Sequence, residues 1–144
     1  MSDSAFLDTN ILVYAYDEHE PKKQKKAQYI LTAGIEQENI VVSVQVMSEF
    51  FNVVTRHIRK PMSAEEAQEI INTLSILPVQ ELDLTIVNRA IDTHKTYQIS
   101  FWDSMIISAA ERAECTMIIS EDLSHGQTYH NMVVRNPFTD SQLM

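Results

Sequence analysis

Four acidic residues lie in segments of the chain that are otherwise strongly apolar. Asp8 occurs in FLDTNILVYAY, Glu49 in VVSVQVMSEFFNVV and Asp103 in ISFWDSMIISAA, while Asp122 follows TMIIS. None of these segments contains a Lys or an Arg. Because a carboxylate is rarely buried unless it is paired or bound to a metal, these four acids are the candidates for chemistry.

Carboxylates that share one cleft repel one another, and desolvation increases that repulsion, so either their proton affinities rise or a cation compensates. No Cys or His is interleaved with the four acids at ligand spacing, so the ligand set would consist of oxygen alone. Such a set suits Mg²⁺ or Mn²⁺ better than zinc. These ions can activate a water molecule and stabilise a leaving oxygen, so the reaction that fits is phosphodiester hydrolysis.

Each acid also has a structural explanation of its own. Asp8 could cap the segment that begins at Thr9, and Glu49 could pair with Arg56. Asp103 could form a capping box with Ser100, and Asp122 could begin a turn. For any single acid, the structural explanation and a role in chemistry have about equal support. All four together would need four separate explanations, which favours a shared site.

The elements that must position these acids follow from the hydrophobic pattern. Short apolar runs predict strands at 5–7, 40–42, 79–82, 116–119 and 132–134. Helical spacing predicts helices that begin at Pro21, after Ser43 and at the Ser63–Glu66 capping box, followed by helices over 85–97 and 103–113. This alternation predicts an α/β fold, a three-layer α/β/α sandwich with a short central parallel sheet. Ligands bind at the carboxyl ends of such strands, where Asp8 and Asp122 are expected.

Length and composition exclude several classes of protein. The 144 residues, 44% hydrophobic and 22% charged, fit one soluble domain spanning 1–144, with 139–144 expected to be a frayed tail. The single cysteine, Cys115, excludes an intramolecular disulfide and is expected to be a small buried hydrophobic residue. No membrane-spanning run and no signal peptide is evident, so a cytoplasmic protein is expected. Two glycines cannot build a phosphate-binding loop.

The net charge of -9 argues against a protein that coats nucleic acid non-specifically. The basic residues nevertheless gather in two clusters, which either contact RNA phosphates or form solvated helix faces. The first cluster contains Lys22, Lys23, Lys25 and Lys26, and the second contains Arg56, Arg59 and Lys60.

Two further groups of residues are expected to be structural. Phe101 and Trp102 adjoin Asp103 and could stack on a base, but a place in the core is the stronger expectation for them. His125 and His130 lie near Asp122, but their spacing does not match common zinc sites and no cysteine is close.

The acidic segments together resemble the motifs of a known family. DTNILVYA at 8–15, SEF at 48–50, FWDSMI at 101–106 and SED at 120–122 resemble, in order and spread, the acidic motifs of the PIN domain, and most of all VapC-type toxins. The resemblance implies a compact α/β/α sandwich and a Mg²⁺- or Mn²⁺-dependent ribonuclease. It implies that Asp8, Glu49, Asp103 and Asp122 are catalytic and bind the metal, supported by Thr9, Asn10 and Ser120.

The resemblance also implies partners. VapC-like toxins usually form homodimers, and a small antitoxin inhibits them by laying its C-terminal segment across the active-site groove. Two other functions stay open at this point: a catalytically inactive binding module, and a phosphatase with Asp8 as nucleophile. The phosphatase is the weaker of the two, because its chemistry commonly uses a second acid two residues on, where this chain has Asn10.

Overall fold

A six-stranded sheet forms the centre of the protein in a computed structural model, which describes residues 3–139. The strand order is β3-β2-β1-β4-β6-β5, and every neighbouring pair is parallel except β5 with β6. The predicted tail lies outside the described residues except for Thr139. The strands are β1 (Ala5–Leu7), β2 (Ile40–Ser43), β3 (Val79–Gln80), β4 (Met117–Ile119), β5 (Thr128–Tyr129) and β6 (Met132–Arg135).

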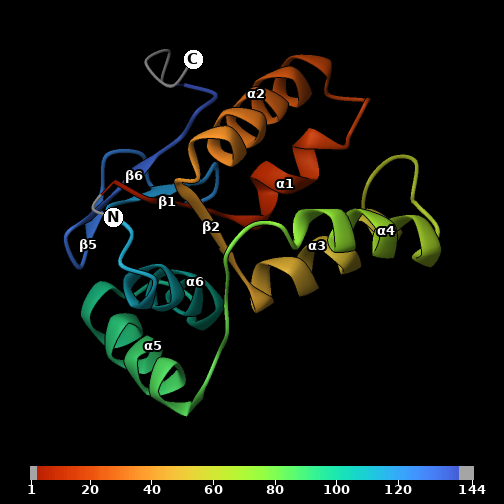
Figure 1. The fold of residues 1–144 in the computed structure, drawn as a ribbon. Helices are drawn as coiled ribbons and strands as arrows, with labels where there is room; N and C mark the ends of the chain where they lie inside the picture. The colour runs from red at the N-terminus through yellow and green to blue at the C-terminus, as the bar shows by residue number, and fades with distance from the viewer. Residues whose placement is uncertain (1–2, 140–144) are drawn as a thin grey trace.

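Helices cover the sheet on both sides, as the α/β/α prediction requires. Figure 1 shows α1 and α2 on one side of β1 and β2, and α5 and α6 on the opposite side. The helices are α1 (Thr9–Ala15), α2 (Pro21–Gln37), α3 (Val44–Arg56), α4 (Ala64–Leu74), α5 (Leu84–Tyr97) and α6 (Phe101–Arg112). No helix between residues 3 and 139 is both long and apolar enough to cross a bilayer.

Local sequence signals account for several helix starts. The Ser43 hydroxyl accepts a hydrogen bond from the Val46 N–H, which caps α3. Ser63 and Glu66 form the predicted capping box at the start of α4. Pro21 occupies the first turn of α2, where its missing N–H leaves no intrahelical hydrogen bond unmade. These predictions are confirmed because each depends only on neighbouring residues.

Two elements were not predicted. The chain turns into α1 immediately after Asp8, so the apolar residues of 9–15 form a short helix. Strand β5 pairs with β6 through a two-residue turn at His130 and Asn131, both of which have positive φ. Such a turn is typical of a tight hairpin, but it is usually marked by a glycine, and this one has none.

The core lies between the sheet and its helices. Phe6, Ile11, Phe50 and Ile118 are fully buried in it. Cys115 is also buried, and burial raises the pKa of its thiol to about 11. The prediction of a small buried residue at this position is confirmed, and a thiol that stays protonated is a poor nucleophile.

Gly34 allows α2 to approach β2 closely. A Cβ atom at this position would overlap the side chain of Ile40 at three of its carbon atoms. We expect Gly34→Ala to lower the free energy of unfolding by about 1–2 kcal/mol, because overpacking outweighs the better helix propensity of alanine. Urea denaturation measures this change. Adding Ile40→Val to Gly34→Ala should recover part of the loss, and no recovery would show that crowding against Ile40 is not the cause.

Candidate active site at the carboxyl edge of the sheet

Strands β1 and β4 bring Asp8 and Ser120 together. The two strands are parallel neighbours with Leu7 opposite Ile119, so the next residue of each strand emerges at the same edge of the sheet. The Ser120 hydroxyl donates a 2.7 Å hydrogen bond to Asp8 Oδ2. The Thr9 N–H donates a hydrogen bond of the same length to Asp8 Oδ1, so Asp8 also caps α1. The structural explanation for Asp8 therefore holds together with its place in the site.

Asn10 joins Asp8 to Asp122. Its Nδ2 atom lies 3.3 Å from Asp8 Oδ2 and 3.2 Å from Asp122 Oδ2, and donates to both. Its Oδ1 atom accepts a hydrogen bond from the Glu121 N–H at 3.0 Å. Asp8 is only 5% exposed, whereas Asp122 is exposed to solvent. One amide group therefore holds a buried and an exposed carboxylate at the same place.

Ser120 shapes the turn that carries Asp122. Its Oγ atom accepts hydrogen bonds from the Asp122 and Leu123 N–H groups while its hydroxyl donates to Asp8. The turn that the sequence suggested at Asp122 is therefore built by Ser120. Asn10 and Ser120 were predicted as polar supports, and each contacts two of the candidate acids, Asp8 and Asp122.

Glu49 reaches the site from α3 and is held by two donors. The Thr9 hydroxyl donates to Glu49 Oε1 at 2.6 Å, and Gln45 Nε2 donates to Oε2 at 3.0 Å. Within residues 3–139 Glu49 makes these contacts instead of the suggested pair with Arg56. Gln45 was not singled out in the sequence, although a buried glutamine in the apolar segment VVSVQVM is a signal of a polar contact.

Asp103 enters from the other side of the sheet. It lies in the first turn of α6, and its N–H donates to the Ser100 hydroxyl at 3.1 Å, so Ser100 caps this helix. The Ser100 half of the suggested capping box is thus present. The Asp103 side chain is half-buried.

The acids influence one another electrostatically. Burial raises the pKa of Asp8 to about 6, and the charges of Asp122 and Glu49 add to that rise against the opposing hydrogen bonds from Ser120 and Thr9. Burial and the same two charges raise the pKa of Asp103. Asp122 and Glu49 therefore act on both of the other acids. A divalent cation beside them would relieve this repulsion.

The donor set fits a hard divalent ion that keeps several of its waters. In the described part of the chain no group of three or more His, Cys, Asp or Glu side chains is placed so that it could hold a metal ion. Mg²⁺ commonly uses one or two carboxylates, with water and substrate phosphate completing its shell. Asp8 and Asp122, which share the Asn10 amide, are the pair that meets this need best. Simultaneous ligation by all four acids stays a prediction.

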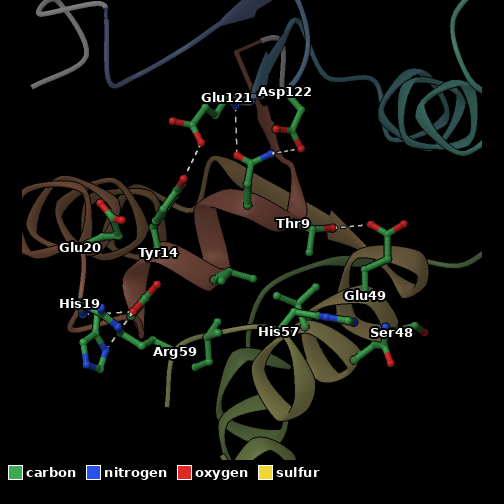
Figure 2. Close-up of a pocket in the computed structure, with 16 residues that line it drawn as sticks. Thr9, Tyr14, His19, Glu20, Ser48, Glu49, His57, Arg59, Glu121 and Asp122 are labelled. Carbon is green, nitrogen blue, oxygen red and sulfur yellow. Dashed lines mark hydrogen bonds and ion pairs between the residues drawn. The ribbon is translucent and has the colours of Figure 1, made fainter. Parts of the chain in front are cut away.

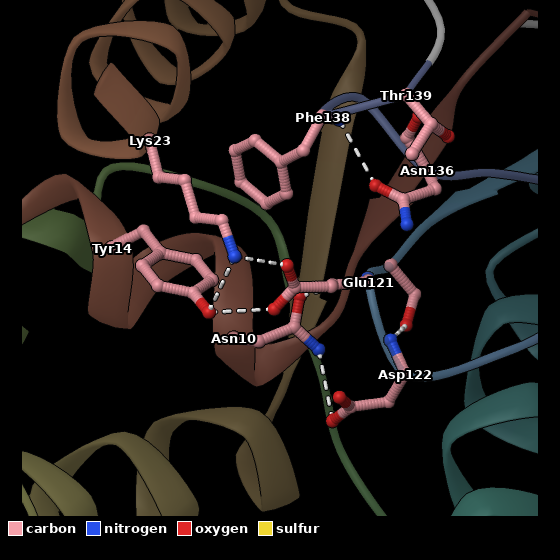
Figure 3. A network of polar contacts seen from close by, with 9 residues as sticks. Asn10, Tyr14, Lys23, Glu121, Asp122, Asn136, Phe138 and Thr139 are labelled. Atoms are coloured by element: carbon pink, nitrogen blue, oxygen red, sulfur yellow. Dashed lines mark hydrogen bonds and ion pairs between the residues drawn. The ribbon is translucent and has the colours of Figure 1, made fainter. Parts of the chain in front are cut away.

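The carboxylate of Glu121 has different partners from the carboxylate of its neighbour Asp122 (Figure 3). It accepts hydrogen bonds from the Tyr14 hydroxyl at 2.6 Å and from Lys23 Nζ at 2.5 Å. Lys23 also lies over the Tyr14 ring, 4.8 Å from its centroid. Glu121 is therefore neutralised by a lysine, which supports Asp122 as the acid of the site. Lys23 itself is already paired, and the Tyr14 hydroxyl takes part in the same contacts.

A pocket of about 880 Å³ opens beside the acids (Figure 2). Glu49 and Asp122 line one part of it, and His19, His57 and Arg59 line another. Figure 2 shows Asp122 at the top of this pocket and Glu49 at the right, with Arg59 and His57 below them. Glu20 lies at the left, beside His19. The pocket therefore joins negative carboxylates to a basic group, within the size range of small-molecule and cofactor sites.

The aromatic pair next to Asp103 is placed differently from the prediction. Trp102 is 63% exposed, so its place in the core was wrong, while Phe101 packs against Ile86 and Met105 as expected. Trp102 is the second residue of α6 and precedes the continuous buried stretch of this helix, which begins at Ser104. His130 contacts Arg89 and Thr93.

Comparison with known proteins places this geometry in a family. The PIN domain family model matches residues 5–130. A comparison with curated proteins gives no significant match.

Solved structures have the same fold at low sequence identity. A toxin–antitoxin complex from Klebsiella pneumoniae is 18% identical with a TM-score of 0.68, and the alignment covers 93% of this chain and 98% of that one. VapBC2 from Rickettsia felis, bound to a DNA fragment from its promoter, is 19% identical with a TM-score of 0.62, and the alignment covers 92% of this chain and 97% of that one. VapC20 from Mycobacterium tuberculosis, a toxin that cleaves the sarcin–ricin loop, is 16% identical with a TM-score of 0.63, and the alignment covers 80% of this chain and 87% of that one. The family match spans most of the sequence and the folds agree, so the chain belongs to the PIN domain family.

Proposed function

We propose that this protein is a divalent-metal-dependent endoribonuclease and the toxin of a type II toxin–antitoxin pair. The observation that carries the proposal is the pairing of buried Asp8 with exposed Asp122 through Asn10, beside Glu49 and an open pocket. No Lys or Arg forms an ion pair with Asp8, Glu49, Asp103 or Asp122 among residues 3–139. The family match and the toxin-like solved structures support the same function.

The residues have separate roles in the proposed reaction. Mg²⁺ or Mn²⁺, when bound, would activate a water molecule and stabilise the developing charge on the phosphate and the leaving oxygen. Asp8 and Asp122 are the proposed main ligands, and Glu49 and Asp103 complete the negative site. Thr9, Asn10 and Ser120 fix the carboxylates by hydrogen bonds, so that little reorganisation is needed when substrate arrives.

One experiment separates this function from the two alternatives. Purified protein is incubated with a mixed RNA pool and with a phosphomonoester, in Mn²⁺ or in EDTA, beside an Asp8→Asn variant. RNA cleavage that EDTA and the variant both abolish is the expected result. Turnover of the phosphomonoester alone would indicate a phosphatase, and no turnover of either substrate would indicate an inactive binding module or a protein with a very narrow substrate.

The basic clusters, apart from Lys23, which pairs with Glu121, are proposed to bind RNA phosphates, and the pocket distinguishes their members. Arg59 lines the same pocket as Glu49, whereas Lys22 does not. We expect Arg59→Glu to weaken RNA binding and to reduce the slope of log affinity against log salt by about 0.7, the value for one phosphate contact on a single strand. The matched variant Lys22→Glu should change the slope less. Equal slopes for the wild type and Arg59→Glu would show that Arg59 is only solvated.

The proposed partners follow from the similar solved structures and from the net charge of the chain. The solved toxin–antitoxin and VapBC structures support a small antitoxin as partner, and the charge of -9 suits a basic inhibitory segment at the carboxylates. A homodimer and a cytoplasmic site of action complete the proposal. Co-expression with a small protein encoded beside this chain should yield a complex without ribonuclease activity, and light scattering measures the oligomeric state of the chain alone.

A further inference from the structure

Gln45 links two of the candidate acids through the main chain of α6. It lies on α3 one turn before Glu49, and it is 8% exposed. Its Nε2 group donates to Glu49 Oε2 at 3.0 Å and to the main-chain oxygen of Trp102 at 3.1 Å. Trp102 precedes Asp103, so one amide connects the Glu49 carboxylate to the first turn of the helix that carries Asp103.

The other end of the same amide has no partner. Gln45 Oε1 is buried and receives no hydrogen bond within the described residues. Turning the amide over would place this oxygen against the Glu49 carboxylate and the Trp102 oxygen, which are both acceptors. The observed orientation therefore follows from its two acceptors and leaves the carbonyl unpaired. A buried unpaired oxygen lowers stability, and this cost offsets part of what the two hydrogen bonds of Gln45 contribute to folding.

We propose that Gln45 is a positioning residue that holds Glu49 for the divalent cation. This inference rests on the proposed metal-dependent function. Thr9 fixes one oxygen of Glu49 and Gln45 fixes the other, so the rotation of the carboxylate is set from both sides. The bond to Trp102 adds what Thr9 cannot supply, because it ties this carboxylate to α6. Partners of this kind hold metal-ligating groups in place, and their loss commonly weakens metal binding.

The variant Gln45→Met tests the proposal because it nearly keeps the volume and removes both hydrogen bonds. Mn²⁺ binding is measured without RNA, from the electron paramagnetic resonance signal of free Mn²⁺, and metal-free stability is measured by urea denaturation. We expect the Mn²⁺ dissociation constant to rise about 10- to 100-fold. The unfolding midpoint should change little, because the variant removes both an unpaired buried oxygen and two hydrogen bonds. The exposed residue Gln68 provides the matched control, and Gln68→Met should change neither quantity.

A double-mutant cycle shows whether Gln45 acts through Glu49. In a Glu49→Gln background, Gln45→Met should weaken Mn²⁺ binding little further, because the carboxylate that it positions is already gone. Gln45→Asn, whose amide is one methylene too short to reach Glu49, should reproduce the loss of affinity and provides the test if the methionine variant does not fold.

The outcomes separate this inference from the proposed function. Wild-type protein that binds no Mn²⁺ would overturn both. Wild-type protein that binds Mn²⁺, together with Gln45 variants that bind it equally well, would overturn only the role of Gln45. Variants that lose stability but keep their Mn²⁺ affinity once folded would give Gln45 a purely structural role, which also overturns the inference.

Discussion

Replacing Asp8 by asparagine should reduce RNA cleavage by about a thousandfold or more, because a metal ligand that supplies several kcal/mol of charge stabilisation is lost. The same variant should be more stable than the wild type at neutral pH in the absence of metal. Both effects have one origin: the Asp8 carboxylate is buried beside other negative charges and lowers the stability of the fold until a cation binds.

The stability gain depends on pH in a defined direction. The pKa of Asp8 is raised from 3.8 to about 6 in the folded protein, so the folded state binds the proton more tightly than the unfolded state does. Protonated Asp8 therefore favours folding below pH 4, and this contribution is lost as the pH rises through about 6. The two-unit shift corresponds to at most about 3 kcal/mol, and we expect Asp8→Asn to gain about 1–3 kcal/mol at pH 8.

Urea denaturation in EDTA at pH 4.5 and at pH 8 measures this difference. The advantage of Asp8→Asn should be small at the lower pH and full at the higher one, because asparagine can still cap α1. Adding Mn²⁺ should stabilise the wild type and leave the variant nearly unchanged. The exposed Asp92 offers a control, and Asp92→Asn should show neither effect. The amide nitrogen of the variant would face the Asn10 donor, which adds a cost that does not depend on pH. A stability difference between Asp8→Asn and the wild type that does not grow from pH 4.5 to pH 8 would therefore contradict the buried charge of Asp8.

Replacing Asn10 by aspartate should reduce cleavage by about a hundredfold, the upper end of the range for residues that orient metal ligands. The Asn10 amide donates to Asp8 and Asp122 at once, and a carboxylate at this position would repel both. The substitution also removes no volume, so the effect reports on charge and hydrogen bonding. Asn10→Ala, which removes the donor without adding a charge, should lose less, about tenfold.

The same variant distinguishes the ribonuclease from the phosphatase. Phosphatase chemistry of this kind commonly uses a second acid two residues after the nucleophile, and this chain has Asn10 there. Asn10→Asp should therefore raise phosphomonoester turnover if the protein is a phosphatase, and should lower RNA cleavage if it is a ribonuclease. Rates on both substrates are compared with those of Asn72→Asp, a matched change at an exposed position on α4. Unchanged RNA cleavage by Asn10→Asp would show that Asn10 does not orient the acids.

Other features of the site became evident only from contacts between distant segments. Asn10 and Asp122 are 112 residues apart in the chain, and Gln45 and Trp102 are 57 apart. Glu121 and Asp122 are adjacent acids that the sequence hardly separates, yet one is paired with Lys23 and the other is held by Asn10. The exposure of Trp102 depends on where along α6 the burial begins, and the apolar residues around it in the sequence do not indicate that.

The amino-acid sequence alone determined the α/β class, most of the helix starts and the four candidate acids. These follow from hydrophobic spacing, from caps such as Ser43 and Ser63, and from carboxylates in apolar segments, all of which are local properties. Only the tertiary structure decided which polar groups hold each acid, that β5 joins the sheet, and that Gln45 connects α3 to α6. The physical reason is that a hydrogen bond or a Coulomb interaction between distant segments changes strongly when the distance between the two groups changes by a few ångströms. The packing of the whole chain sets that distance.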